Sequence, residues 1–94
     1  MKLTQAVFII LFRKVVIFMP IAAPTIDMIA TGANIRALIK GKGLKVADVQ
    51  TVFGFNTPQA IFKWLRGDAL PSVDNLVILA HLLDVTSDEI LIVD

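Results

Sequence analysis

The chain contains no cysteine and no tyrosine, and it has one histidine. Without cysteine it can form neither a disulfide framework nor a thiolate metal site, which fits a reducing, cytoplasmic location. One histidine cannot make a zinc site alone, so we expect no metal and no cofactor. That histidine, His81, lies between Ala80 and Leu82 in a leucine-rich segment. We interpret it as a structural histidine.

Groups that would form a catalytic site are also missing. The 94 residues are enough for one small domain and exclude a large enzyme. The acidic residues near the C-terminus are not accompanied by any other group with acid, base or nucleophile character. We therefore expect no enzymatic activity.

Basic residues are absent from the C-terminal part of the chain. Residues 68–94 contain six acidic residues and no Lys or Arg, whereas residues 31–67 contain six basic residues and one acidic residue. The formal net charge of +1 conceals this division. Such an asymmetry indicates one surface that faces a polyanion.

A long uninterrupted apolar run is also absent, although residues 1–23 are mostly apolar. Residues 6–12 and 15–19 are apolar, but Arg13 and Lys14 separate them. A membrane-spanning helix needs about 20 predominantly apolar residues, and each central cation costs about 2.5 to 3.5 kcal/mol on insertion.

We therefore treat residues 1–27 as an N-terminal extension. Our favoured hypothesis is that translation starts at Met19 or Met28 and that residues 1–18 are upstream sequence. A membrane-associated or signal-like segment, with residues 6–19 touching the membrane, and a genuine structural extension remain as alternatives.

From Thr31 onward, the sequence predicts short helices. Thr31 is placed to cap a first helix that ends at Gly41 and Gly43. A second helix runs from Val46 to a stop at Gly54, with Asp48 in its first turn, where the helix dipole favours an anion.

The third helix has the clearest start signal. Thr57 and Pro58 place a capping hydroxyl before a proline at the first helical position, and Gly67 ends the helix after Arg66. Gln59 and Lys63, four residues apart, share the face opposite the apolar stripe.

Two more helices complete the pattern. Pro71 and Ser72 open the fourth helix, and Thr86 with Glu89 forms a capping box that begins the fifth. Five helices with short connections and no strand pattern predict an all-α bundle over residues 28–94. Helical spacing predicts that its core contains Ile35, Leu38, Val49, Phe53, Ile61, Trp64, Leu76 and Leu79.

Three segments resemble the Cro/repressor-like, or XRE, helix-turn-helix family. They are the Lys-Trp-x-x-Gly end of the third helix, the Leu-Pro-Ser entry to the fourth (residues 70–72) and the Val-Thr-x-Asp-Glu entry to the fifth (residues 85–89). They occur in the family's order and near its spacing, and the resemblance covers about residues 29–93. Any one of them alone would be weak.

The resemblance implies a sequence-specific DNA-binding transcriptional regulator whose third helix, Thr57–Arg66, enters the major groove of double-stranded DNA. The residues that would meet base edges are Pro58, Gln59, Ala60 and Lys63. Gln59 can bond adenine N6 and N7, Lys63 can reach guanine or a phosphate, and Ala60 can touch a thymine methyl. The residues that would contact the DNA backbone are Arg36, Lys42, Lys45, Thr57 and Arg66.

The sequence also departs from the family pattern. The turn between the second and third helices is one residue longer than is common, and Gln50 stands where a small residue often lets the two helices approach. Lys45 replaces the usual hydroxyl cap of the second helix. Phe62 and Leu65 are apolar at positions that are often polar, which suits a sugar contact, a protein interface or a larger core.

A homodimer would match a pseudo-palindromic site, and part of the apolar end Ile90–Val93 is a candidate to join the subunits. The alternative function is that of an antitoxin-like or membrane-tethered module that binds a protein through Phe62, Leu65 and this apolar end.

Overall fold

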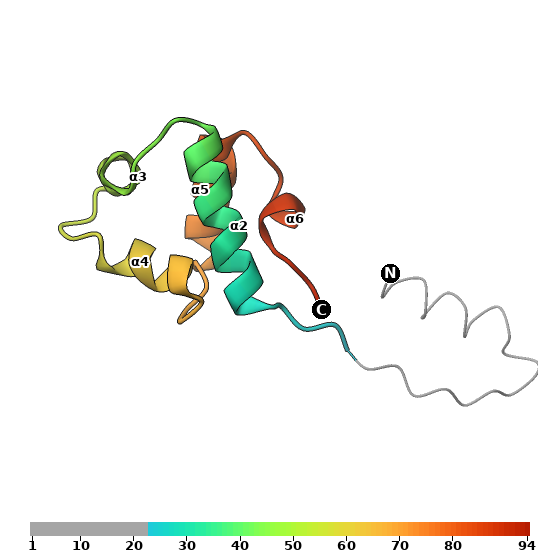
Figure 1. Ribbon diagram of the computed structural model, residues 1–94. Helices are drawn as coiled ribbons and strands as arrows, with labels where there is room; N and C mark the ends of the chain where they lie inside the picture. The colour runs from blue at the N-terminus through green and yellow to red at the C-terminus, as the bar shows by residue number, and fades with distance from the viewer. Residues whose placement is uncertain (1–22) are drawn as a thin grey trace, which may run out of the picture.

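The computed structural model describes residues 23–94, which form five helices (Figure 1). These are α2 (Met28–Gly41), α3 (Val46–Phe53), α4 (Gln59–Arg66), α5 (Val73–Leu83) and the single turn α6 (Ser87–Ile90). The predicted all-α class and the number of helices are confirmed for this part of the chain. The proposed start at Met19 or Met28 and the membrane contact of residues 6–19 concern residues outside the described part, as does most of the extension.

The helices α3 and α4 lie on one side of α2, and α6 with the C-terminal segment lies on the other (Figure 1). The core between them is formed by one side of each helix. Of the residues predicted to be in the core, Ile35, Val49, Ile61, Trp64 and Leu79 are buried, and Leu38, Phe53 and Leu76 pack against them half-buried. No helix in residues 23–94 has both the length and the apolar character needed to cross a membrane.

The start of α2 differs from the prediction. The helix begins four residues earlier, with Asp27 as its N-cap accepting a hydrogen bond from the Ala30 N–H at 3.0 Å. Thr31 is instead fully buried, and its Oγ1 accepts a hydrogen bond from the Ile92 N–H at 2.9 Å. The prediction that Thr31 caps the helix is therefore wrong, because Asp27 was an equally good cap and the threonine is needed inside.

The C-terminal segment is part of this domain. Asn34 Nδ2 donates to the carbonyls of Glu89 and Ile90 at 2.7 and 2.9 Å. Beyond them, Ile26 and Val93 form an antiparallel bridge. Of the end that we considered for subunit contact, Ile90 is fully buried in its own chain, Leu91 and Ile92 are half-buried, and Val93 is exposed.

Two other expectations need correction. His81 is exposed, because the buried face of α5 is formed by Leu79, Ala80 and Leu83 and the histidine lies on the outward face. The start of α4 lies one residue later than expected, so Pro58 and not Thr57 occupies the N-cap position, without a side-chain capping bond. The N-caps Ser72 and Thr86 and the Thr86–Glu89 capping box are present as predicted.

Candidate nucleic-acid interface

The orientation of α4 is fixed by a close approach to α2. A Cβ atom on Gly32 would lie 2.4 Å from the Trp64 carbonyl oxygen and 2.6 Å from that of Leu65. Gly67, which ends α4 with φ +79°, lies so near Ile29 that a Cβ would meet its Cα at 2.8 Å. Only glycine fits at either position, and the two contacts hold the C-terminal end of α4 against α2.

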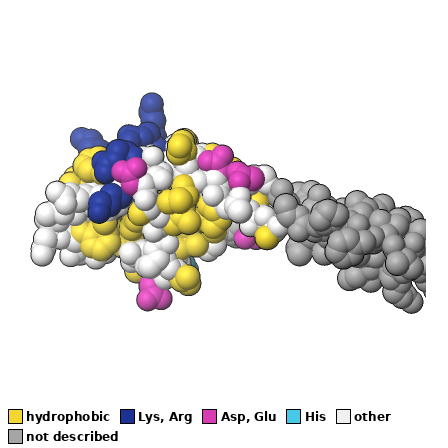
Figure 2. Space-filling view, turned by 90° about the horizontal axis from the view of Figure 1, so that it is seen from below, with side chains coloured by type: hydrophobic (Ala, Val, Ile, Leu, Met, Phe, Trp, Pro, Cys, Tyr) yellow, Lys and Arg dark blue, Asp and Glu magenta, His cyan; other side chains and the backbone are white. Residues whose placement is uncertain are grey.

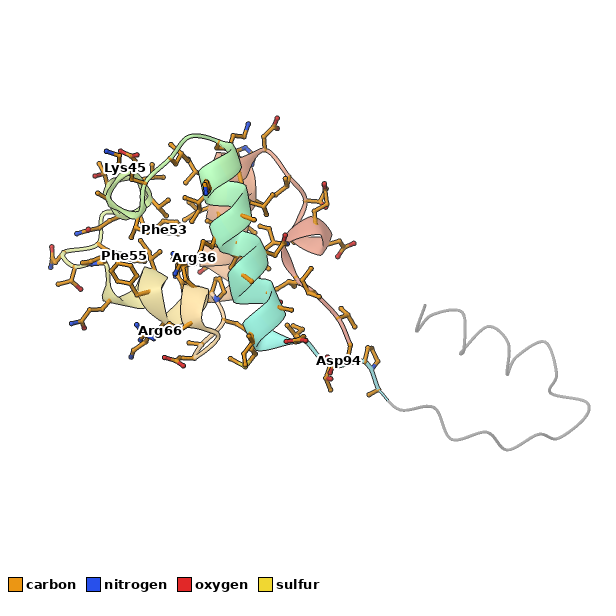
Figure 3. All side chains as sticks on the ribbon, in the orientation of Figure 1. Arg36, Lys45, Phe53, Phe55, Arg66 and Asp94 are labelled. Atoms are coloured by element: carbon orange, nitrogen blue, oxygen red, sulfur yellow. The ribbon has the colours of Figure 1, made fainter. Side chains whose placement is uncertain are left out.

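Aromatic side chains hold the turn before α4 against the second half of that helix. Phe53 and Phe55 stack with their ring centroids 5.1 Å apart, and the Phe53 centroid lies 5.4 Å from that of Trp64 in an edge-to-face arrangement. The three rings connect the end of α3, the turn and α4, as the positions of Phe53 and Phe55 in Figure 3 indicate. Edge-to-face and offset rings are favourable arrangements, so the cluster stabilises the turn.

Gln50 has a role in the turn that the sequence did not reveal. Its Nε2 donates to the Phe55 carbonyl at 3.1 Å, and the Phe55 N–H donates to the Gln50 carbonyl at 3.2 Å. The larger residue at this position therefore fastens the turn. A small residue does allow a close approach of two helices in this domain, but it is Gly32, at the contact of α2 with α4.

The exposed face of α4 carries the polar residues that we predicted to read DNA. Gln59 and Lys63 are exposed one turn apart, while Ile61, Trp64 and Leu65 are buried behind them. Thr57 is exposed just before the helix. Pro58 and Ala60 are half-buried, and Ala60 packs against the core, so the polar pair is the more accessible part of the predicted base-reading set.

Phe62 and Leu65, both apolar at positions that are often polar, differ in how far they are exposed. Leu65 is buried and belongs to the core. Phe62 is 37% exposed and lies between Gln59 and Arg66 in the helical repeat of the exposed face. An aromatic side chain is therefore presented on the same face as Gln59 and Lys63.

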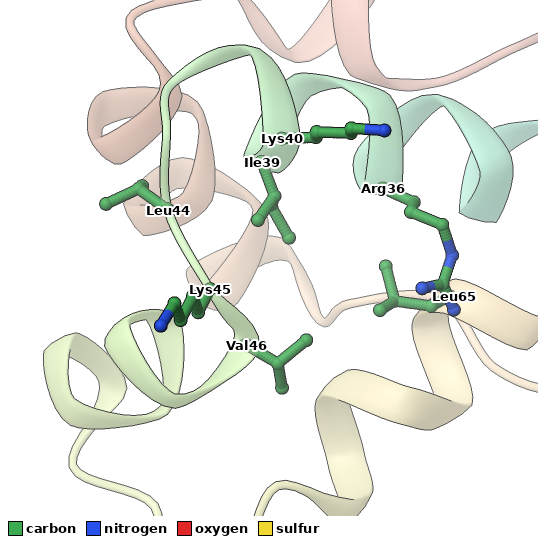
Figure 4. A pocket seen from close by; sticks show the side chains of 7 residues that line it. All are labelled: Arg36, Ile39, Lys40, Leu44, Lys45, Val46 and Leu65. Carbon is green, nitrogen blue, oxygen red and sulfur yellow. The ribbon is translucent and has the colours of Figure 1, made fainter.

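Positive charge gathers near the start of α3. Arg36, Lys40 and Lys45 line an open pocket of about 320 Å³ (Figure 4). The remaining lining side chains are apolar: Ile39, Leu44, Val46 and Leu65. The backbone N–H of Lys45 donates to the Asp48 carboxylate at 2.8 Å, which is the bond that the third helical residue makes in a capping box. The lysine ammonium group has no acceptor and takes no part in capping, and the side chain is exposed.

The other predicted backbone-contacting cations have acidic neighbours. Arg66 Nε lies 2.8 Å from Asp68 Oδ2, and Lys42 Nζ lies 4.0 Å from Asp84 Oδ2. Both pairs are exposed, so each contributes at most about 1 kcal/mol to stability and can be exchanged for another anion.

The basic and acidic residues occupy different parts of the surface. In Figure 2, the Lys and Arg side chains visible on that face lie together, and most of the acidic side chains lie apart from them. Figure 3 places Lys45 and Arg66 on the side of α3 and α4, and Asp94 at the opposite end of the domain. The side bearing α4 is therefore the one suited to a polyanion.

Two short helices joined by a tight turn, with the second helix exposing polar side chains beside a cluster of cations, define a helix-turn-helix domain. The comparisons agree with this class. The family model Helix-turn-helix (HTH_3) matches residues 35–90, so the chain belongs to this family, as the XRE-type motifs predicted.

A solved structure is also similar. The restriction-modification controller protein C.AhdI from Aeromonas hydrophila is 26% identical, with a TM-score of 0.61 over 68% of this chain and 96% of the controller protein. No curated protein sequence matches the chain. With the family and the fold established, the protein is a DNA-binding transcriptional regulator of the helix-turn-helix class.

Proposed function

We propose that the protein reads a specific duplex DNA sequence by placing the exposed face of α4 in the major groove. The observation that carries this proposal is the division of α4 into a buried side, with Ile61 and Trp64, and an exposed side, with Gln59 and Lys63. Gln59 pairs with adenine, and Lys63 bonds a guanine or a neighbouring phosphate. Pro58 and Ala60, being half-buried, set how closely the start of the helix approaches the bases.

Phe62 adds an apolar contact to this reading. It is more exposed than Ala60 and lies on the face of Gln59 and Lys63, where the C5-methyl group of thymine is the apolar feature of the groove. We therefore assign the thymine contact to Phe62 in place of Ala60.

Arg36, Lys40 and Lys45 neutralise backbone phosphates beside the groove, and Lys42, Thr57 and Arg66 extend this contact. Phosphate contacts supply most of the non-specific affinity of such proteins. The acidic neighbours Asp68 and Asp84 weaken the contribution of Arg66 and Lys42, since each must give up its partner to a phosphate.

The protein acts by binding and not by catalysis, as a homodimer on a pseudo-palindromic site in the cytoplasm. Two copies related by a two-fold axis present two α4 helices to successive major grooves on one side of the duplex. A protein-binding module finds less support, because Leu65 and Ile90, which it would use, are buried.

A selection from random duplex DNA with the full chain tests the proposal. We expect an enriched motif with inverted symmetry and adenine or thymine positions in each half. A library that shows no enrichment over several rounds would contradict sequence-specific binding.

A further inference from the structure

The outward face of α5 carries apolar side chains that nothing in residues 23–94 covers. Val73 is 78% exposed, Val77 56% and Ile78 41%, although α5 already contributes Leu79, Ala80 and Leu83 to the core. Large apolar side chains grouped on one helix face indicate an interaction surface more often than isolated ones do.

Two polar residues accompany them on this face. Asp74 and His81 are both exposed and lie seven residues apart. Seven residues are nearly two helical turns, so the two side chains point in nearly the same direction. Val77 and Ile78 flank the line between them. The midpoint of Asp74 and His81 along the helix is also the midpoint of Val77 and Ile78, with each polar residue about 5 Å from it.

This arrangement is self-complementary for two antiparallel copies of the helix. If a two-fold axis passes between Val77 and Ile78, each valine meets the isoleucine of the other copy. The same axis brings Asp74 opposite His81 of the partner subunit, so that each carboxylate has an imidazole N–H to accept from.

We propose that the outward face of α5 is the contact between two copies of this chain, packed antiparallel with Val77 and Ile78 at the centre and Asp74 beside His81 of the partner subunit. This inference rests on the proposed function, since it supplies the two-fold axis that an inverted-repeat DNA site requires. It places the subunit contact on α5 and not at the C-terminal end, where Ile90 is buried.

The charges favour a second copy over a membrane as the occupant. α5 carries Asp74 and no Lys or Arg, so it offers an anionic lipid surface no lysine or arginine to bind. A second copy instead provides one histidine for each Asp74.

The contact is small. An 11-residue helix is about 16 Å long, so the paired helices form an interface at the low end of the range for specific association. We therefore expect a weak dimer in solution that becomes populated when two half-sites on one duplex hold the subunits close together.

Sedimentation of the full chain over a range of concentrations tests the contact. Val77→Asp, His81→Asp and Asp74→Lys are each expected to raise the dimer dissociation constant at least tenfold. The double variant Asp74→Lys/His81→Asp restores opposite charges across the axis and is expected to return the constant to within about threefold of the original. Asp88→Lys, an exposed charge reversal on α6, is the matched control and should leave it unchanged.

Binding to a duplex with a single half-site separates this inference from the proposed function. The α5 variants should bind the half-site as the original chain does and should lose affinity only for the full inverted repeat. A chain that stays monomeric on the inverted repeat, or a double variant no better than its single parents, would overturn the α5 contact. Failure of the original chain to bind the half-site would instead count against the proposed function.

Discussion

At the scale of single residues, we expect the affinity for DNA to depend more on where the cations lie on the surface than on how many there are. Residues 23–94 hold six basic and eight acidic side chains, so the described part is net acidic. Arg36, Lys40 and Lys45 line one pocket, and we propose that this cluster supplies much of the affinity for DNA. Lys42 lies within the same stretch of sequence and Arg66 ends α4, but each has an acidic neighbour.

Replacing Lys45 by alanine tests the phosphate contact. We expect Lys45→Ala to weaken binding to all duplexes by a similar factor, about three- to tenfold, and to reduce the salt dependence by about one counterion. Fluorescence anisotropy with the selected duplex and a scrambled duplex measures both effects. Lys42→Ala should weaken both duplexes less, because Asp84 already lies near Lys42; an effect confined to the selected duplex would contradict the assignment.

The thymine contact of Phe62 can be tested on the DNA as well as on the protein. Replacing a thymine of the selected motif by uracil removes only the methyl group, which Phe62 is expected to touch. We expect the original chain to lose affinity at one such position in each half-site, whereas Phe62→Ala is insensitive to the change. Equal losses for both proteins would show that Phe62 does not make this contact.

At the scale of helices, two glycines determine how α4 sits on the domain. A methyl group on Gly32 or Gly67 would overlap backbone atoms of another helix, and Gly67 also has a positive φ. These contacts are backbone to backbone, so they cannot be relieved by a change of rotamer. The orientation of α4 on the domain therefore depends on two glycines, which have no side chain to contact DNA.

Alanine substitution tests this dependence. We expect Gly32→Ala to lower the free energy of unfolding by about 1 to 3 kcal/mol through overpacking, and Gly67→Ala to lower it further through added backbone strain. Gly41→Ala is the matched control, because no atom lies within 4 Å of a Cβ there, and it should be neutral or stabilising by up to about 1 kcal/mol. Urea unfolding followed by circular dichroism measures all three, and equal effects at Gly32 and Gly41 would contradict the close approach.

The helices themselves were largely predictable from the sequence, because local signals mark their ends. The capping hydroxyls of Ser72 and Thr86 function as expected. Thr31 was wrongly predicted to be the cap because it carries the same capping signal as Asp27, and only its buried hydrogen bond to the Ile92 N–H separates them. The tie from Gln50 to Phe55 and the contact of Gly32 with α4 were not predictable, since both depend on how the elements pack.

At the scale of the whole molecule, the protein divides into a basic side around α3 and α4 and acidic surroundings near the C-terminus. The net charge hides this division. The sequence was sufficient to predict the division of charge along the chain. It was not sufficient to predict which cations lie together in one pocket, because that depends on how the helices pack.

The division predicts a steep salt dependence. With three to five phosphates neutralised per subunit, the slope of log affinity against log salt concentration should be about −3 to −5 per subunit. Titrations of the selected duplex at increasing potassium chloride measure it. A slope near zero is the result expected for an apolar protein interface, and it would contradict DNA binding through this surface.

The central claim is that the exposed face of α4 reads bases, and Gln59 tests it most directly. The measurement is the affinity of the original chain and of Gln59→Ala for the selected duplex and for duplexes changed at one base pair at a time. We predict that Gln59→Ala costs about 1 to 3 kcal/mol on the selected duplex and removes discrimination at one adenine position while keeping it elsewhere. Unchanged affinity and unchanged discrimination at every position would contradict the placement of α4 in the major groove.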